Sequence, residues 1–140
     1  MSRNLETVKH IYESFGRGDV PAILDVLADD VAWESWADNS AAKAGVPWLQ
    51  PRHGKAGAAE FFGLLGSVLA VKDFRVLSLM DGGDTVAAEF EIECDVVPTG
   101  GHYRDEEIHL WTFNAEGKVA RLRHYADTAK HIAAAAAGQR

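Results

Sequence analysis

Apolar positions in several parts of the chain repeat at helical spacing. Over residues 4–16 they fall three and four apart, which predicts an amphipathic helix. Asp19 can cap a second helix, with Pro21 in its first turn, that runs to about residue 30. The same spacing returns over residues 54–69 and predicts a third helix. An alanine-rich helix is expected over residues 128–137.

Other segments alternate between apolar and polar positions, as half-buried strands do. We predict strands over residues 31–36, 74–80, 85–97, 106–113 and 118–127. In the first of these, Trp33 and Ser35 share one face and Glu34 lies on the other. In the third, Phe90 and Ile92 belong to an apolar face, and a row of acidic residues forms a solvated one.

The order of these elements predicts the fold class. Residues 37–53 contain two prolines and no periodicity, so we interpret them as a long loop that could act as a lid. Helices, one strand, this loop, a helix and then four antiparallel strands indicate an α+β domain with a curved antiparallel sheet. No repeat or linker divides residues 1–140, which we expect to form a single domain.

Composition narrows the class of protein. With 140 residues, of which 47% are hydrophobic, the chain is long enough to bury a core. A net charge of −7 argues against nucleic acid or an anionic membrane as a partner. Cys94 is the only cysteine, so an internal disulfide is excluded. No apolar run approaches the length of a membrane span, and we expect a soluble cytoplasmic protein.

The most informative chemistry lies in the hairpin over residues 106–127. Glu107 and His109 alternate on one strand, and His124 lies on the next. A four-residue turn would place Glu107 opposite His124, and His109 opposite Leu122. A glycine bulge at Gly117 would instead shift the pairing by one residue and redirect the side chains.

An imidazole beside a carboxylate among aromatic rings can have its pKa tuned towards the working pH. Glu107, His109 and His124 are therefore our candidate catalytic residues. The alternative is that Glu107 and His124 form a structural pair while His109 packs in the core, because such pairs also perturb pKa values.

Candidate pocket walls come from the apolar faces of several elements, and Trp33 is the preferred one. The full set of predicted pocket-lining residues is Trp33, Ser35, Phe61, Phe90, Ile92 and Trp111. No phosphate loop, dinucleotide fingerprint, nucleophile elbow or metal-binding spacing is present. The sequence therefore implies neither a cofactor nor a metal.

Several short motifs in fixed order resemble the SnoaL-like and ketosteroid-isomerase-like branch of the nuclear transport factor 2-like superfamily. They are Phe15-Gly16-Arg17-Gly18-Asp19, Leu27-Ala28-Asp29-Asp30-Val31, His53-Gly54, the run from Trp111 to Val119, and Arg123-His124-Tyr125-Ala126-Asp127. The resemblance implies a cone of curved sheet and three helices around an apolar pocket, as in a cystatin-like α+β barrel. It also implies a homodimer, and it implies that His109 and His124 both face the pocket.

The departures from the family pattern limit the chemistry. Ketosteroid isomerases use a tyrosine on the first helix and two aspartates, and the matching positions here hold Ile11, Ser35 and His109. A standard steroid isomerase is therefore not expected. In SnoaL-type cyclases and limonene-epoxide-type hydrolases, an aspartate on the last strand corresponds to His124, and histidine can replace it as a proton shuttle.

Two hypotheses of different classes follow. The first is a cofactor-independent isomerase, cyclase, hydrolase or dehydratase that acts on a small apolar or polyketide-like molecule. In it, His124 is the acid or base, Glu107 orients it and His109 polarises a ligand oxygen. The second is a non-catalytic binding protein for a small apolar molecule, because a fold does not fix a function.

Overall fold

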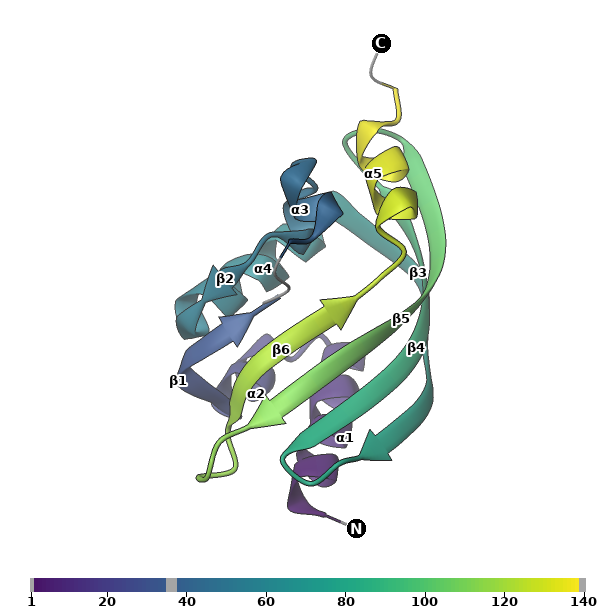
Figure 1. Ribbon diagram of the computed structural model, residues 1–140. Helices are drawn as coiled ribbons and strands as arrows, with labels where there is room; N and C mark the ends of the chain where they lie inside the picture. Colours follow the sequence, from purple (N-terminus) through teal and green to yellow (C-terminus); the bar gives the residue numbers. More distant parts are fainter. Residues whose placement is uncertain (1, 35–37, 139–140) are drawn as a thin grey trace.

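The computed structural model describes residues 2–34 and 38–138. Its centre is a strongly curved six-stranded sheet with the strand order β2-β1-β6-β5-β4-β3 (Figure 1). The last four strands in the chain run antiparallel in succession, as predicted, and β1 joins this sheet parallel to β6. The strands are β1 (Leu27–Trp33), β2 (Arg52–His53), β3 (Leu69–Asp81), β4 (Thr85–Val96), β5 (Gly101–Phe113) and β6 (Val119–Tyr125).

Helices cover the concave side of the sheet and one of its ends. In Figure 1, α1 and α2 lie behind the strands, whereas α5 stands at the end where β5 begins. The helices are α1 (Arg3–Gly16), α2 (Val20–Asp25), α3 (Ser40–Lys43), the short 3-10 helix η1 (Pro47–Leu49), α4 (Gly54–Val68) and α5 (Thr128–Ala136). The predicted α+β class with a curved antiparallel sheet is confirmed. Within the described residues, no helix has the length and apolar character needed to cross a membrane.

The second helix is shorter than predicted. Asp19 does cap it, accepting a hydrogen bond from the backbone N–H of Ala22, but it ends at Asp25 and β1 begins at Leu27. The apolar positions at 26 and 27 fit either period, so helical spacing alone placed the boundary too late. Because β1 starts early, it pairs with β6 along the sheet and carries its last residues to the cavity.

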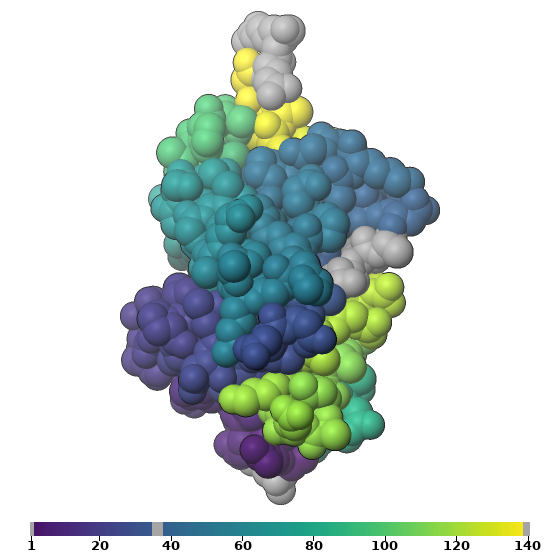
Figure 2. Space-filling view, turned by 90° about the vertical axis from the view of Figure 1, so that its left-hand side faces the viewer, coloured from purple at the N-terminus to yellow at the C-terminus, as the bar shows by residue number. Residues whose placement is uncertain are grey.

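The interpretation of residues 37–53 as an irregular loop is wrong for their described part. This segment contains α3, η1 and β2, and Ala41, Val46, Trp48 and Leu49 are buried. Asn39 caps α3 through its side-chain oxygen. Figure 2 shows the segment packed against α4 and not standing away from the body of the protein. Its elements are too short for sequence periodicity to reveal.

Close packing of α5 on the sheet can be tested at Gly101, the first residue of β5. A Cβ atom built there would overlap the backbone carbonyl oxygen of Ala134 on α5. We expect Gly101→Ala to lower the free energy of unfolding by about 1–3 kcal/mol, because a backbone group cannot move aside cheaply. Urea denaturation of the variant measures this change.

The matched control is Gly66→Ala on α4. A Cβ atom at Gly66 meets nothing within 4 Å, and alanine is favoured over glycine in a helix by about 1 kcal/mol. Gly66→Ala should therefore raise stability. A Gly101→Ala variant as stable as the wild type would show that α5 does not pack on β5 as described.

Candidate functional site

The concave face of β5 carries a row of side chains that forms the base of the site. Along this strand, buried and exposed residues alternate, and the inward-facing positions include Tyr103, Asp105, Glu107, His109 and Trp111. The strand begins five residues before the predicted one. The same alternation that placed Glu107 and His109 on one face thus extends to Asp105 and Tyr103.

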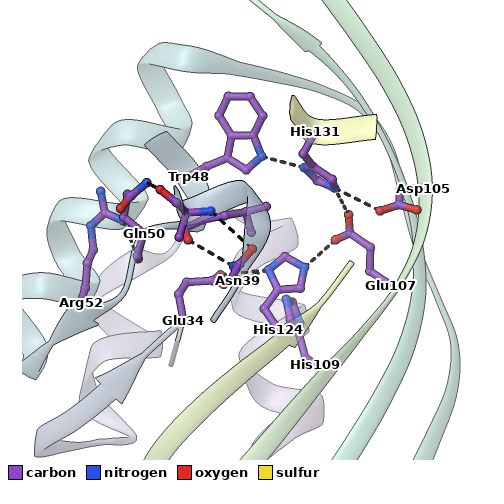
Figure 3. A network of polar contacts seen from close by, with 12 residues as sticks. Glu34, Asn39, Trp48, Gln50, Arg52, Asp105, Glu107, His109, His124 and His131 are labelled. Carbon is purple, nitrogen blue, oxygen red and sulfur yellow. Dashed lines mark hydrogen bonds and ion pairs between the residues drawn. The ribbon is translucent and has the colours of Figure 1, made fainter. Parts of the chain in front are cut away.

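His124 on β6 lies between two buried carboxylates (Figure 3). Its Nε2 is 2.6 Å from Oε1 of Glu107, and its Nδ1 is 3.0 Å from Oε2 of Glu34. All three side chains are at most 10% exposed. Because ionised carboxylates only accept hydrogen bonds, both ring nitrogens of His124 must donate. The arrangement is that of an imidazolium held between two glutamates.

The pKa values agree with this charge distribution. Burial alone lowers the pKa of His124, but the charges of Glu34 and Glu107 raise it well above its ordinary value. Burial alone raises the pKa of Glu107, but the charge of His124 and hydrogen bonds from His124 and His131 hold it well below its ordinary value. The charged forms of both groups are therefore favoured in the folded protein.

His109, unlike His124, is neutral. It lies directly across from His124 in the sheet, with ring centroids 4.6 Å apart. The indole N–H of Trp111 donates to the hydroxyl of Tyr12 over 3.0 Å, and that hydroxyl is 2.7 Å from Nδ1 of His109. The hydroxyl therefore donates to Nδ1, and the proton of His109 resides on Nε2. Burial, together with the charge of His124, lowers the pKa of His109 well below its ordinary value.

His131, from α5, is the third histidine of the site and contacts the carboxylate oxygen of Glu107 that His124 does not. Its Nε2 is 2.7 Å from Oε2 of Glu107 and 3.1 Å from Oδ2 of Asp105, and its Nδ1 is 2.8 Å from Nε1 of Trp48. The potential ligand atoms of Asp105, Glu107 and His131 all lie within 4.8 Å of one another. A cation there would need the lone pair of Nε2. Because Trp48 occupies the lone pair of Nδ1, Nε2 must instead carry a proton, and the group fits a hydrogen-bonded cluster better than a metal site.

An apolar cavity of about 80 Å³ lies against these polar groups. Glu34, Glu107, His109 and His124 contribute to its wall, and aromatic rings form much of the rest. Of the predicted lining residues, the structure places Trp33, Phe61, Phe90, Ile92 and Trp111 on the cavity, whereas Ser35 lies outside the described residues.

The predicted pairing of the hairpin is wrong by two residues. His109, not Glu107, lies opposite His124, and Trp111 lies opposite Leu122. Phe113 pairs with Val119, and an irregularity beside Thr112 adds a further shift. Two shifts of one residue restore the original faces, because side chains alternate with a period of two. Glu107 therefore still reaches His124, but diagonally.

Comparison with known proteins places the chain in a family. A family model for a SnoaL-like domain matches residues 8–122. The chain belongs to the SnoaL-like domain family. No curated protein sequence matches this SnoaL-like chain.

Solved structures with the same fold cover nearly the whole SnoaL-like chain. An NTF2-like protein of unknown function from Burkholderia pseudomallei is 25% identical, with a TM-score of 0.78 and coverage of 98% of this chain and 100% of that one. TerC, co-crystallised with polyporic acid, is 24% identical, with a TM-score of 0.75 and coverage of 96% and 98%. A candidate polyketide cyclase from Xanthomonas campestris pv. campestris is 24% identical, with a TM-score of 0.70 and coverage of 95% and 96%. The cone expected from the resemblance is thus the fold of this protein.

Sequence reasoning missed four polar residues of this SnoaL-like site. Glu34 was assigned to the face opposite Trp33, but its φ of 56° breaks the strand alternation and turns its side chain inward. Asp105 could have been found by extending the alternation of β5 backwards. The position that matches the ketosteroid-isomerase tyrosine was assigned to Ile11, whereas the neighbouring Tyr12 supplies a hydroxyl to the site. For His131, in an alanine-rich helix, no local pattern signals a partner.

Removing the cation between the two glutamates should be strongly destabilising. We expect His124→Gln to lower the free energy of unfolding at pH 8 by about 3–5 kcal/mol, because two buried carboxylates then lack a countercharge. Urea denaturation across pH measures this effect. In the wild type, the contribution of His124 is fully present below its unfolded pKa of about 6.5 and is lost only as the pH rises through the raised folded value. The variant lacks this term, so its stability should not show the decline that His124 causes in the wild type as the pH rises above about 6.5.

His102 provides a matched control. It also lies between two carboxylates, Asp95 and Glu93, but on the exposed face of the sheet. Exposed pairs contribute little, so His102→Gln should be nearly neutral. Equal effects of the two substitutions would contradict a charged, buried His124.

Proposed function

We propose that this protein is a cofactor-independent enzyme that moves a proton on a small, largely apolar ligand bearing a carbonyl or hydroxyl oxygen. The observation that carries the proposal is the Glu34–His124–Glu107 charge cluster on the wall of an apolar cavity, beside a neutral His109. Titratable groups with opposed pKa shifts in one cavity are the usual apparatus of acid–base catalysis.

Each polar group has a role that fits its protonation. Within the described residues, Nε2 of His109 has no hydrogen-bond acceptor, so this N–H can donate to a ligand oxygen and polarise it. Glu34, a carboxylate on the cavity wall, accepts a proton from the carbon or hydroxyl next to that oxygen. His124, already protonated, donates one N–H to Glu34 and the other to Glu107, and Glu107 thereby orients it. Glu34 then returns the proton it accepted to another position of the same ligand.

The size of the cavity favours a second candidate, a non-catalytic binding protein. A free volume of about 80 Å³ is small beside the roughly 300–1,000 Å³ of typical ligand sites. Trp33 and Trp111 pack edge to face and both line the cavity. Under this alternative, the histidines only select a ligand, and a larger ligand requires these aromatic rings to move.

Activity is tested after a thermal-shift screen of enolisable ketones, phenols, epoxides and, because of the TerC complex, polyporic acid. With a ligand that is turned over, Glu34→Gln should reduce kcat about 10²- to 10⁴-fold, the usual contribution of a positioned proton acceptor. His109→Phe should reduce it about 10²-fold by removing the donor to the ligand oxygen. Circular dichroism confirms that each variant is folded.

Glu106→Gln is the control, because Glu106 is adjacent in sequence to the site residue Glu107 but exposed on the opposite face of β5. It should leave kcat unchanged. Turnover that survives both Glu34→Gln and His109→Phe would overturn the catalytic role. Ligand binding without any turnover across the screen would favour the binding protein.

We also propose that the protein is a cytoplasmic homodimer that associates through the outer face of its sheet. Ile108 and Tyr125 are cross-strand neighbours on that face and are 36% and 37% exposed. Apolar side chains that lie side by side on a sheet face support a subunit contact there. Sedimentation equilibrium should give a dimer that Ile108→Glu dissociates, and a wild-type monomer would exclude this arrangement.

A further inference from the structure

We propose that Trp48 fixes His131 as a neutral imidazole protonated on Nε2, and that His131 thereby acts as the residue that positions Glu107 in the charge cluster. This protonation state does not depend on whether the cavity is catalytic. Only a contribution of the positioned Glu107 to a reaction rests on the proposed function.

The direction of one hydrogen bond decides the protonation. Nε1 of Trp48 is 2.8 Å from Nδ1 of His131. An indole nitrogen can donate but cannot accept, so Nδ1 must present its lone pair. The single ring proton therefore lies on Nε2, where it is shared by Oε2 of Glu107 and Oδ2 of Asp105 at 2.7 and 3.1 Å. A second proton on His131 would break the bond from Trp48.

The surrounding structure holds Trp48 in this orientation. Its indole is 3% exposed in η1, between the buried residues Val46 and Leu49. It also stacks on Tyr103, with ring centroids 6.1 Å apart and an interplanar angle of 14°. The ring of Tyr103 in turn lies 4.2 Å from that of His131. The donor is thus fixed by packing on two sides, and rotating it away would leave a buried N–H without a partner.

The charged groups around His131 act in opposite directions. Burial and the charge of His124 lower its pKa, but the hydrogen bonds to Asp105 and Glu107 and the charge of Glu107 outweigh them and raise the pKa above its ordinary value. Lys130, on the same helix, has its Nζ 3.9 Å from Oδ1 of Asp105 and offsets part of that carboxylate. Tyr103 and Cys94 are neutral, because burial raises the pKa of both. Trp48 opposes a second proton, because Nδ1 can accept from the indole only while it keeps its lone pair.

The Nε2–H of His131 holds the carboxylate of Glu107 in place. Each of its oxygens receives one N–H donor, Oε1 from His124 and Oε2 from His131. The carboxylate therefore cannot rotate away from His124, and the positive charge of the cluster stays on the histidine that faces the cavity. Through this contact, η1 and α5 support a carboxylate carried by the sheet.

The test is long-range proton–nitrogen NMR of the histidine side chains, recorded on the unliganded protein between pH 5 and pH 9. In the wild type, neutral His131 should show the Nε2–H tautomer, and His124 should show both nitrogens protonated at pH 7. Trp48→Phe keeps an aromatic ring at this position but removes the indole N–H that donates to His131. It should raise the protonation midpoint of His131 by about one pH unit, the equivalent of one net hydrogen bond.

Trp33→Phe is the matched control, because Trp33 is equally buried but its Nε1 has no hydrogen-bond partner within the described residues. It should leave the signals of His131 unchanged. An Nδ1–H tautomer in the wild type, or a Trp48→Phe variant with an unaltered midpoint, would overturn the proposal.

A second pair of variants keeps the test decisive if Trp48→Phe does not fold. The amide of His131→Gln can accept from Trp48 and donate to Glu107, whereas His131→Leu can do neither. His124 should stay doubly protonated at pH 7 in the first variant. In His131→Leu, its protonation midpoint should move, because Glu107 is no longer held. Identical His124 titrations in the two variants would refute a positioning role, whatever the outcome of the activity assays.

Discussion

The site depends on the countercharge that His124 provides to buried carboxylates. Glu34, Asp105 and Glu107 are each only 2–3% exposed, and removing an ionised carboxylate from water costs several kcal/mol. His124 lies between two of them and offers one N–H to each. Without this imidazolium, two glutamates would be buried with no countercharge between them.

Several elements must meet for that pairing to form. β5 and β6 place Glu107 and His124 on the concave face through antiparallel pairing, while β1, parallel to β6, delivers Glu34 at its end. The positive φ of Glu34 is unfavourable for a residue with a side chain. It is maintained because it turns the carboxylate towards His124. The contact between Glu34 and His124 therefore offsets the cost of the local backbone strain.

The sequence revealed the parts of this design that repeat with a regular period. The α+β class, the antiparallel succession of strands and the common face of Glu107, His109 and His124 all follow from alternation, and they survived an error of two residues in the hairpin register. Glu34 was missed because a single left-handed residue reverses the alternation. Trp48 and His131 were missed because they meet across 83 positions of the chain, from a one-turn helix and an alanine-rich tail. Contacts between such segments are set by packing and leave no local signal.

The three histidines of the cluster differ in charge because their partners differ in what they can do. Carboxylates only accept hydrogen bonds, so His124, between two of them, must donate twice and is charged. Indole nitrogens only donate. Each of the other two histidines accepts a hydrogen bond that originates at an indole. Trp48 donates directly to His131, and Trp111 donates through the hydroxyl of Tyr12 to His109. Each of these two rings is left neutral, with its proton on Nε2. The tryptophans, which pattern alone assigns to the apolar core, therefore help to determine where the protons of the site reside.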